Sequence, residues 1–437
     1  MSTQIFCAST LYGAATLAAA LDSDCFRPAD RRILLVSNNA GNPEVTSAID
    51  AMPGFEQLCD RFDDVISWNE TIAPFHPGGW SPRPDDTPLW ERHLRLLWGL
   101  GDDAVELAVE SIQVNPALAV SQIFSVAPVD VYADGLMSYG PTRFKIDPLV
   151  GTRVRRLLHL DLVADLKPLL LTEFGVEPET VPTDAFLKVL GAIGSTAPEL
   201  PELPADAALL LGQYLSALSI LTPEEEEDLH VRMLRGAVGK GHRRVVFKPH
   251  PTAPARYGRA LEEEAERLGV ELTVLDVPVL AEVLYERTRP ALVVGCFSTA
   301  LFTAKTFYGL DTARVGTEVL LERLTPYQNS NRVPVTLADA LLPDLESGRT
   351  AQVGSLTGLV ETVGFMMQPQ IYPGLYEAAT AYLTRRPAGI DHYFKRRRLT
   401  ALGLPGGLPT RLAFIPRNAT VRRVARRVRT MKRTAIG

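Results

Sequence analysis

The sequence predicts an α/β protein made of two Rossmann-like domains joined by a hinge. The chain has 437 residues, of which 46% are hydrophobic and 22% are charged, so each half can bury a core of its own. Apolar runs of strand length alternate with helical patterns, which is typical of parallel sheets. A short segment at 194–206, GSTAPELPELPAD, contains three prolines and is the best candidate for the linker.

The first half predicts a sheet with a long loop over its binding face. Strands are expected at Thr3–Ser9, Arg32–Ser37, Asp64–Ser67, Ala119–Ser125 and Val129–Ala133. Helices are expected at Gly13–Leu21, Pro43–Ala51 and Trp90–Leu97. The segment Asn69–Asp86 is rich in Pro and Gly, which indicates a loop.

The alternation is more regular in the second half. Thr222 precedes Pro223, so the pair is placed to begin a helix at Pro223–Gly236. The other expected elements are strands at Ala207–Leu211, Arg243–Phe247, Val270–Leu275, Ala291–Val294 and Thr312–Val315, and helices at Pro254–Leu268, Pro278–Glu286 and Thr299–Tyr308. The chain is therefore divided into a first domain at 1–194, a linker at 195–206, a second domain at 207–385 and a tail at 386–437.

Charge is distributed unevenly along the chain. Residues 391–437 contain 13 Lys and Arg and one Asp, a net charge of +12, whereas the other residues contain 32 basic and 50 acidic side chains, a net charge of −18. In TVRRVARRVRTMKR, aliphatic residues recur every three or four positions, which predicts a basic amphipathic helix that binds an anionic membrane surface. A solvated tail is the alternative. Nucleic acid is not expected as a partner, because no aromatic residues interleave the basic ones.

Cysteine spacing and the N-terminus indicate a cytoplasmic protein. The four cysteines lie far apart with no C-x-x-C pair, so neither a disulfide framework nor a metal site is expected. Residues 1–21 are uncharged but lack the basic segment of a signal peptide, and no window is apolar enough to span a bilayer. We therefore expect a cytoplasmic protein that the tail brings to the inner face of the cell membrane.

Ligands of open α/β sheets bind beyond the carboxyl ends of the strands, and three motifs lie there. The first is Lys248-Pro249-His250-Pro251-Thr252, directly after the expected strand RRVVF. An imidazole beside a helix N-terminus is well placed to hold a phosphate. A second His-Pro pair begins at His76, but no strand precedes it, and we interpret it as structural.

The other two motifs each allow two interpretations. Gly295-Cys296-Phe297-Ser298-Thr299 follows the strand ALVV and is either a phosphate-binding turn or an ordinary helix cap. Tyr132-Ala133-Asp134-Gly135 ends the strand that begins VDVY. Its Asp-Gly pair is either a turn or a carboxylate presented as a general base.

Taken in order along the chain, these motifs resemble those of the bacterial sialyltransferases, in particular their polysialyltransferase branch. The resemblance runs from the first strand to about Val315. It implies a GT-B fold, in which two Rossmann-like domains face a cleft and the second domain holds most of the nucleotide. It also implies CMP-sialic acid, or a related CMP-nonulosonate, as the donor.

The resemblance also implies roles for individual residues. Asp134 would lie in the catalytic-base motif, and His250 would meet the CMP phosphate as the second catalytic residue. The residues implied to bind substrate are Gly135, Gly212, Gln213, Lys248, Pro251, Glu282, Gly295, Ser298 and Thr299. For Glu282, placed near the ribose hydroxyls, an exposed helical glutamate is an equal alternative.

One position departs from the family pattern. The family usually has two acidic residues before the glycine, whereas the first of them is Ala133 here. Asp130 lies upstream and should project toward the same face of the strand as Tyr132. We take Asp134 as the base.

The function predicted on these grounds is inverting, metal-independent transfer of sialic acid from a CMP-sugar, without a cofactor, to a glycan or glycolipid acceptor. Two alternatives stay open. One is a nucleotide-sugar 2-epimerase, which would recognise UDP in place of CMP. The other is a catalytically degenerate protein of the same fold that binds a glycan or nucleotide, which Ala133 keeps open.

Overall fold

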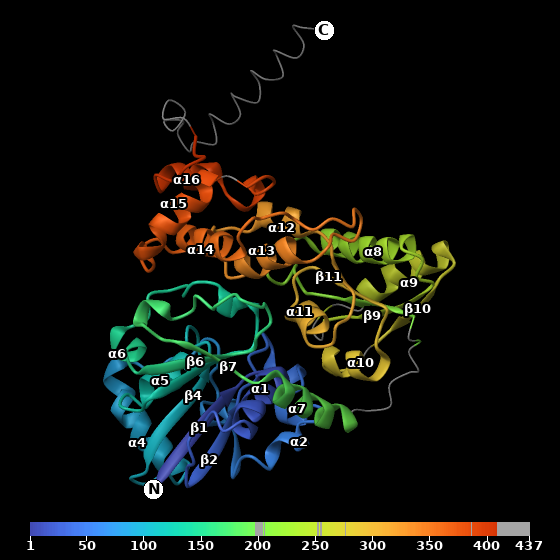
Figure 1. Ribbon diagram of the computed structural model, residues 1–437. Coiled ribbons are helices and arrows are strands. Elements are labelled where there is room, and N and C mark those ends of the chain that lie inside the picture. The colour runs from blue at the N-terminus through green and yellow to red at the C-terminus, as the bar shows by residue number, and fades with distance from the viewer. Residues whose placement is uncertain are drawn as a thin grey trace, which may run out of the picture.

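Two parallel sheets form the framework of the protein. The computed structural model describes residues 1–196, 204, 206–250, 253, 256–275, 277–385 and 387–408. Its strands form a seven-stranded sheet in the order β3-β2-β1-β4-β5-β6-β7 and a five-stranded sheet in the order β10-β9-β8-β11-β12 (Figure 1). In each sheet the first strand of the chain, β1 or β8, lies in the interior, and later strands are added on both sides of it, as in a Rossmann-like domain. The predicted fold class is confirmed.

The first sheet and its helices occupy the lower part of Figure 1. The strands are β1 Ser2–Ala8, β2 Arg31–Val36, β3 Asp64–Ser67, β4 Ala104–Glu110, β5 Val129–Ala133, β6 Val154–His159 and β7 Pro178–Thr180. The helices are α1 Leu11–Asp22, α2 Glu56–Cys59, α3 Trp68–Thr71, α4 Thr87–Leu97, α5 Ala117–Ile123, α6 Pro148–Gly151 and α7 Thr183–Ser195. Five 3-10 turns connect them, at η1 Pro43–Val45, η2 Ile49–Ala51, η3 Pro84–Asp86, η4 Leu136–Tyr139 and η5 Thr172–Phe174.

Two predicted elements of the first half are wrong. The segment expected as a strand at Ala119–Ser125 lies mostly in helix α5, where an apolar run packs against the core and Ser121 donates a hydrogen bond to the carbonyl of Ala117. The strand between β1 and β5 is instead β4, which the prediction missed. Pro43–Ala51 forms two short 3-10 turns in place of a helix.

The second domain follows the predicted alternation closely. Its strands are β8 Ala208–Leu211, β9 Arg244–Lys248, β10 Glu271–Val274, β11 Leu292–Gly295 and β12 Thr312–Arg314. Its helices are α8 Pro223–Gly239, α9 Arg256–Leu268, α10 Ala281–Thr288, α11 Thr299–Thr306, α12 Thr317–Arg323 and α13 Arg332–Leu341. Thr222 caps α8 as expected, because its side chain accepts a hydrogen bond from the backbone of Glu225, and the Glu225 carboxylate bonds back to the Thr222 N–H.

The C-terminal helices return to the first domain. They are α14 Leu356–Met367, α15 Tyr376–Arg385 and α16 Arg396–Ala401, and Figure 1 shows α14 above the first sheet. The hydroxyl of Tyr372 accepts a hydrogen bond from the Thr142 N–H at 2.9 Å and donates one to Glu173 at 2.7 Å. The segment between α14 and α15 is thus bonded to the first domain.

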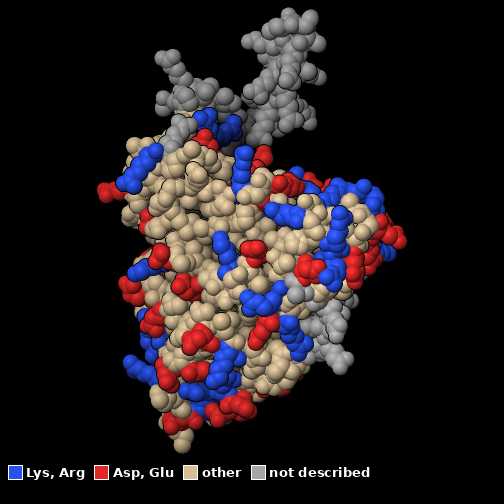
Figure 2. Space-filling view, turned by 45° about the vertical axis from the view of Figure 1, so that its right-hand side comes forward, with Lys and Arg blue, Asp and Glu red and all other residues tan. Residues whose placement is uncertain are grey.

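The predicted linker and tail are described only in part. Helix α7 reaches Ser195, and 197–203 and 205 lie outside the described residues. Residues 409–437 also lie outside them, so the amphipathic tail helix stays a prediction. On the face drawn in Figure 2, acidic and basic side chains are interspersed. None of the described helices is both long and apolar enough to cross a bilayer.

Candidate active site

Two of the three predicted motifs meet at the junction of the domains. Thr299 opens α11 in the second domain, and its hydroxyl oxygen accepts a hydrogen bond from the Leu136 N–H in the first domain at 3.4 Å. A Cβ atom on Gly135 would lie 3.0 Å from the same oxygen, so a larger residue there would crowd the Thr299 side chain. The Asp-Gly turn after β5 and the Ser-Thr motif after β11 therefore face each other directly.

Asp134 lies against the N-terminus of α1. The Thr10 hydroxyl donates to Oδ2 of Asp134 at 3.4 Å and also caps α1 by accepting the Gly13 N–H at 2.9 Å. A Cβ atom on Gly13 would stand 3.2 Å from the same carboxylate oxygen and 3.1 Å from the Tyr132 hydroxyl. A helix N-terminus favours negative charge, so α1 both positions and stabilises the ionised carboxylate.

A second carboxylate, Glu110, lies beside Asp134. Glu110 ends β4 and stands opposite Tyr132 in the register of β4 with β5. Its Oε2 accepts a hydrogen bond from the Ser9 hydroxyl at 2.5 Å. The sequence reasoning missed Glu110 because it missed β4. The signal that would have found it is an acidic residue at the end of the segment AVELAVE.

These surroundings bring the titration of Asp134 close to neutral pH. Burial, followed by the charge of Glu110, raises the pKa of Asp134 to about 7, against the opposing hydrogen bond from Thr10. Burial also raises the pKa of Glu110 above its ordinary value. A carboxyl group with a pKa near the working pH can accept a proton in one step and release it in the next, as a general base requires.

We expect Glu110→Gln to shift the acid limb of the pH–rate profile to lower pH by on the order of one unit. Removing the negative charge of Glu110 lowers the pKa of Asp134, so the base ionises at lower pH. The matched control is Glu106→Gln on the same strand, because Glu106 is bonded to Gln4 and Arg155. An acid limb that stays in place in Glu110→Gln, or moves equally in the control, would contradict this account.

Asp130 cannot supply the missing acidic residue of the motif. It is 2% exposed, and its carboxylate pairs with Arg155 at 2.7 Å and with Arg156 at 3.2 Å. Both arginines belong to β6, and their ion pairs hold the Asp130 carboxylate within the sheet. Ala133 is also buried, in a hydrophobic core of the first domain. Asp134 is therefore the acidic residue of this motif that lies next to α11.

The first turn of α1 lies between the two domains. The hydroxyl of Tyr12 is buried and has no hydrogen-bond partner among the described residues. Burial and then the charges of Glu282 and Asp134 raise its pKa well above the ordinary value. Tyr12 therefore lies within electrostatic reach of a carboxyl group from each domain. No pattern in the sequence indicated this role for Tyr12.

The second-domain residues after β9 are polar and differ in burial, because Lys248 is half-buried and the His250 side chain is exposed. Partial desolvation, followed by the charge of Lys248, lowers the pKa of His250, so the neutral imidazole is favoured. The ring of His250 lies 6.4 Å from that of Tyr214. Glu282 is 3% exposed and accepts a hydrogen bond from Thr303 at 2.7 Å. The alternative of an exposed helical glutamate at this position is therefore wrong.

The loops after β8 and β9 approach each other closely at Gly212. Its N–H donates to the carbonyl of Lys248 at 2.9 Å. A Cβ atom there would stand 3.0 Å from the Phe247 ring and 3.2 Å from the Cα of Pro249. Only a glycine fits without movement of the loop that carries His250.

Gln213 connects this loop to the motif after β11. Its Oε1 accepts the Phe297 N–H at 3.0 Å, and Ser298 caps α11 by accepting the Ala300 N–H at 3.3 Å. Gly295 lies at the end of β11, against the side chain of Leu301. Pro251 lies outside the described residues. All other predicted site residues of the second domain therefore sit at the carboxyl edge of its sheet.

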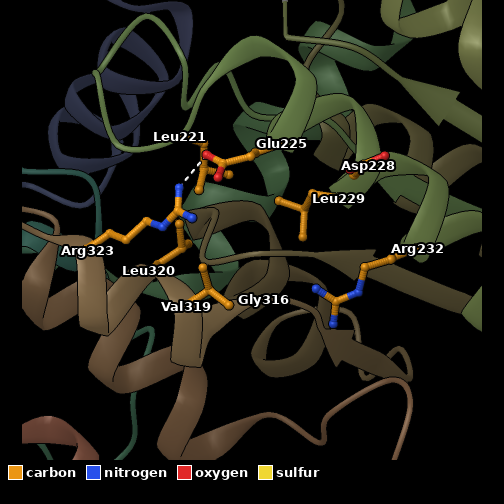
Figure 3. Close-up of a pocket in the computed structure, with 9 residues that line it drawn as sticks. All are labelled: Leu221, Glu225, Asp228, Leu229, Arg232, Gly316, Val319, Leu320 and Arg323. Carbon is orange, nitrogen blue, oxygen red and sulfur yellow. Dashed lines mark hydrogen bonds and ion pairs between the residues drawn. The ribbon is translucent and has the colours of Figure 1, made fainter. Parts of the chain in front are cut away.

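A separate cavity lies away from this edge, between α8 and α12 (Figure 3). It measures about 230 Å³ and has a wall of leucine and valine side chains. Glu225 and Arg323 form an ion pair at one end, and Arg232 lies at the other in the view of Figure 3. None of the predicted site residues lines it, so the site at the domain junction is unrelated to this cavity. Among the described residues, no group of His, Cys, Asp and Glu side chains is arranged to hold a metal ion.

Two Rossmann-like domains whose carboxyl-edge loops meet, here at Leu136 and Thr299, have the architecture of the GT-B class of glycosyltransferases. The sequence matches the model of the family described as "Alpha-2,8-polysialyltransferase (POLYST)" over residues 4–317. The chain belongs to the alpha-2,8-polysialyltransferase family. No curated protein matches the sequence.

Several solved structures are similar in outline. A UDP-GlcNAc 2-epimerase from Methanocaldococcus jannaschii has 13% identity and a TM-score of 0.43, covering 72% of this chain and 83% of its own. The GT-B domain of a sialyltransferase from Photobacterium damselae has 12% identity and a TM-score of 0.39, covering 77% and 96%. MurG from Acinetobacter baumannii has 10% identity and a TM-score of 0.41, covering 87% and 94%. All three scores lie below 0.5, so none of these likenesses decides the function.

Proposed function

We propose that the protein transfers sialic acid, or a related nonulosonate, from a CMP-sugar to a glycan acceptor, with inversion and without a metal ion. The observation that carries the proposal is the position of Asp134. It is a carboxyl group with a pKa raised to about 7, and the next two residues contact Thr299 on the nucleotide side of the junction. Membership of the family supports sialic acid as the sugar.

The proposed chemistry is a single displacement at the anomeric carbon. Asp134 accepts the proton of an acceptor hydroxyl as its oxygen forms the new bond, and the bond to the CMP phosphate breaks with its electron pair on the phosphate. The transition state resembles an oxocarbenium ion, as in other glycosyl transfers. Attack from the face opposite the leaving group inverts the anomeric centre.

The leaving phosphate would be stabilised by the second domain. His250 follows β9, whereas Ser298, Thr299 and the N-terminal N–H groups of α11 follow β11, on the other side of β8. Fixed donors of this kind stabilise developing negative charge. The Lys248 ammonium adds a positive charge behind His250. Glu282 on α10, whose charge acts on Lys248, is the group proposed to meet the ribose hydroxyls.

The experiment that tests this proposal combines turnover with nucleotide binding. Wild-type protein is incubated with CMP-sialic acid and an acceptor panel, and CMP release is followed while CMP and UDP are titrated by calorimetry. We expect CMP to bind and to be released from the donor. Preferred binding of UDP would favour the 2-epimerase alternative, and CMP binding without turnover would favour a binding protein.

We also propose that the tail holds the enzyme on an anionic membrane surface, where a lipid-linked acceptor would be within reach. The support is the net charge of +12 over residues 391–437. Co-sedimentation with anionic liposomes at low and high salt tests this. No binding at low salt would defeat it.

A further inference from the structure

A fully buried carboxylate in the second domain, that of Glu226, has no role in the chemistry proposed above. Glu226 is the fourth residue of α8 and belongs to the acidic run at 224–228. Its side chain is 0% exposed, whereas the other acidic residues of the run are half-buried or exposed. Helix α8 packs against β8, β11 and α9, so Glu226 is on the face of α8 that meets the domain core. A buried carboxylate needs hydrogen-bond donors to offset its desolvation.

The donors to Glu226 are the backbone of one loop and a tyrosine. Oε1 accepts a hydrogen bond from the Leu215 N–H at 2.5 Å, and Oε2 accepts one from the Ser216 N–H at 2.9 Å. The buried Tyr257 hydroxyl on α9 donates to Oε2 at 3.0 Å and lies 3.0 Å from the Ser216 hydroxyl. These three donors are neutral, and the N-terminus of α8 also favours the negative charge. Glu226 therefore fastens this loop to α8 and α9.

The fastened loop lies between the two motifs proposed to bind the CMP phosphate. We call residues 212–222 the β8–α8 loop. Strand β8 stands between β9 and β11 in the sheet, so its loop separates the loops that follow those strands. Gln213 accepts the Phe297 N–H at 3.0 Å on one side, and the ring of Tyr214 lies 6.4 Å from that of His250 on the other. These two residues directly precede the segment bonded to the carboxylate, so its hydrogen bonds limit how far they can shift.

The charge of Glu226 also acts on His250. Partial desolvation and the charge of Lys248 lower the pKa of His250, whereas the charge of Glu226 raises it. Lys248 acts from β9 and Glu226 from α8, so charges of both signs influence the imidazole. Glu226 is therefore close enough to His250 for removal of its charge to be detected there.

We infer that Glu226 is a positioning residue for nucleotide binding, because it fixes the β8–α8 loop that holds the His250 motif and the Ser298-Thr299 motif on either side of it. The inference rests on the proposed transfer from a CMP-sugar and adds to it a residue that touches neither substrate. A loop that is fixed in advance does not have to be ordered when CMP binds. Once the loop is loosened, that ordering weakens the affinity for CMP and raises the donor KM, whereas kcat at saturating donor changes little.

Replacing Glu226 with Gln tests the inference. The amide oxygen can accept one of the two backbone N–H groups, but the amide nitrogen is a donor and meets the other. We expect the Kd of CMP and the donor KM to rise by about 10-fold, with kcat and the acceptor KM within about 3-fold of the wild type. The matched control is Glu227→Gln, which changes the adjacent, half-buried residue of α8 and should bind CMP as the wild type does.

A fall in kcat with unchanged donor KM and CMP affinity would overturn the inference, because general destabilisation reduces the amount of active enzyme without changing its affinity. Equal effects in Glu227→Gln would also overturn it. Tyr257→Phe covers the case in which Glu226→Gln does not fold. It removes one of the three donors and leaves both backbone bonds, so the Kd of CMP should rise by about 3-fold. A wild-type Kd in Tyr257→Phe would then overturn the inference.

A titration of His250 keeps the inference testable if the proposed transfer fails. The imidazole C–H resonance of His250 is followed against pH by NMR in the wild type, Glu226→Gln and Glu227→Gln, without any ligand. Removing the negative charge that raises the pKa of His250 should lower that pKa in Glu226→Gln alone. Absence of CMP binding by the wild type would defeat the proposed function, whereas an equal pKa of His250 in the three proteins would overturn the inference.

Discussion

Replacing Asp134 with Asn is expected to reduce sialyl transfer by about 10²- to 10⁴-fold, the usual contribution of a general base. The amide keeps the shape of the side chain and still accepts the hydrogen bond of Thr10, but it cannot take up the acceptor proton. Transfer is followed as CMP release in the presence of acceptor, at the pH optimum of the wild type.

Binding of CMP serves as the internal control for this variant. The residues proposed to bind CMP, His250, Ser298 and Thr299, lie in the second domain, so an affinity for CMP close to that of the wild type would show that this domain is still folded. Full transfer by Asp134→Asn would mean that another group, of which Glu110 is the nearest carboxylate, acts as the base.

Replacing His250 with Ala is expected to reduce CMP release by about 10²- to 10³-fold, the effect of removing one donor that stabilises a developing anion. Partial desolvation, followed by the charge of Lys248, lowers the pKa of His250, so the neutral imidazole can donate a hydrogen bond to the phosphate as the bond to the sugar breaks. The measurement is donor turnover at saturating acceptor.

The matched control is His76→Ala, which removes the histidine of the other His-Pro pair. His76 is exposed and bonds the carbonyl of Ala40 at 2.8 Å in the long loop of the first domain. An equal loss in the two variants would count against His250 as a phosphate ligand, because His76 lies in the first domain, away from the residues proposed to bind CMP.

Local pattern was sufficient for the second domain from β8 to β12, whereas helices α12 to α15 were not predicted. The capping box at Thr222 and Glu225 begins α8 where the sequence placed a helix, and strand and helix lengths follow the apolar runs. The elements of the first domain were harder to predict from the sequence. In α5 and β4 the apolar content alone is misleading: α5 is apolar enough to be taken for a strand, whereas β4 carries Glu106 and Glu110. Those acids are tolerated because partners from other strands and loops meet them.

Prediction of the candidate site from the sequence was limited in the same way, because local pattern does not show contacts between distant segments. The three motifs were visible because each is contiguous and follows a strand. Glu110 and Tyr12 were not, because each is a single residue whose role depends on its neighbours in space. Glu282 is a helical glutamate in the sequence, and its burial against Thr303 follows only from the packing of α10 on α11.

The sequence by itself determined the two-domain α/β plan, the order of the strand-end motifs and the basic tail, since these are properties of adjacent residues. Only the tertiary structure decided which carboxylates are near one another. The strand order β1-β4-β5 brings Glu110 beside Asp134, while Asp130, four residues before Asp134, is held by Arg155 and Arg156 from β6. Pairing between distant strands sets the burial and charge around each group, and those set its pKa and its chemistry.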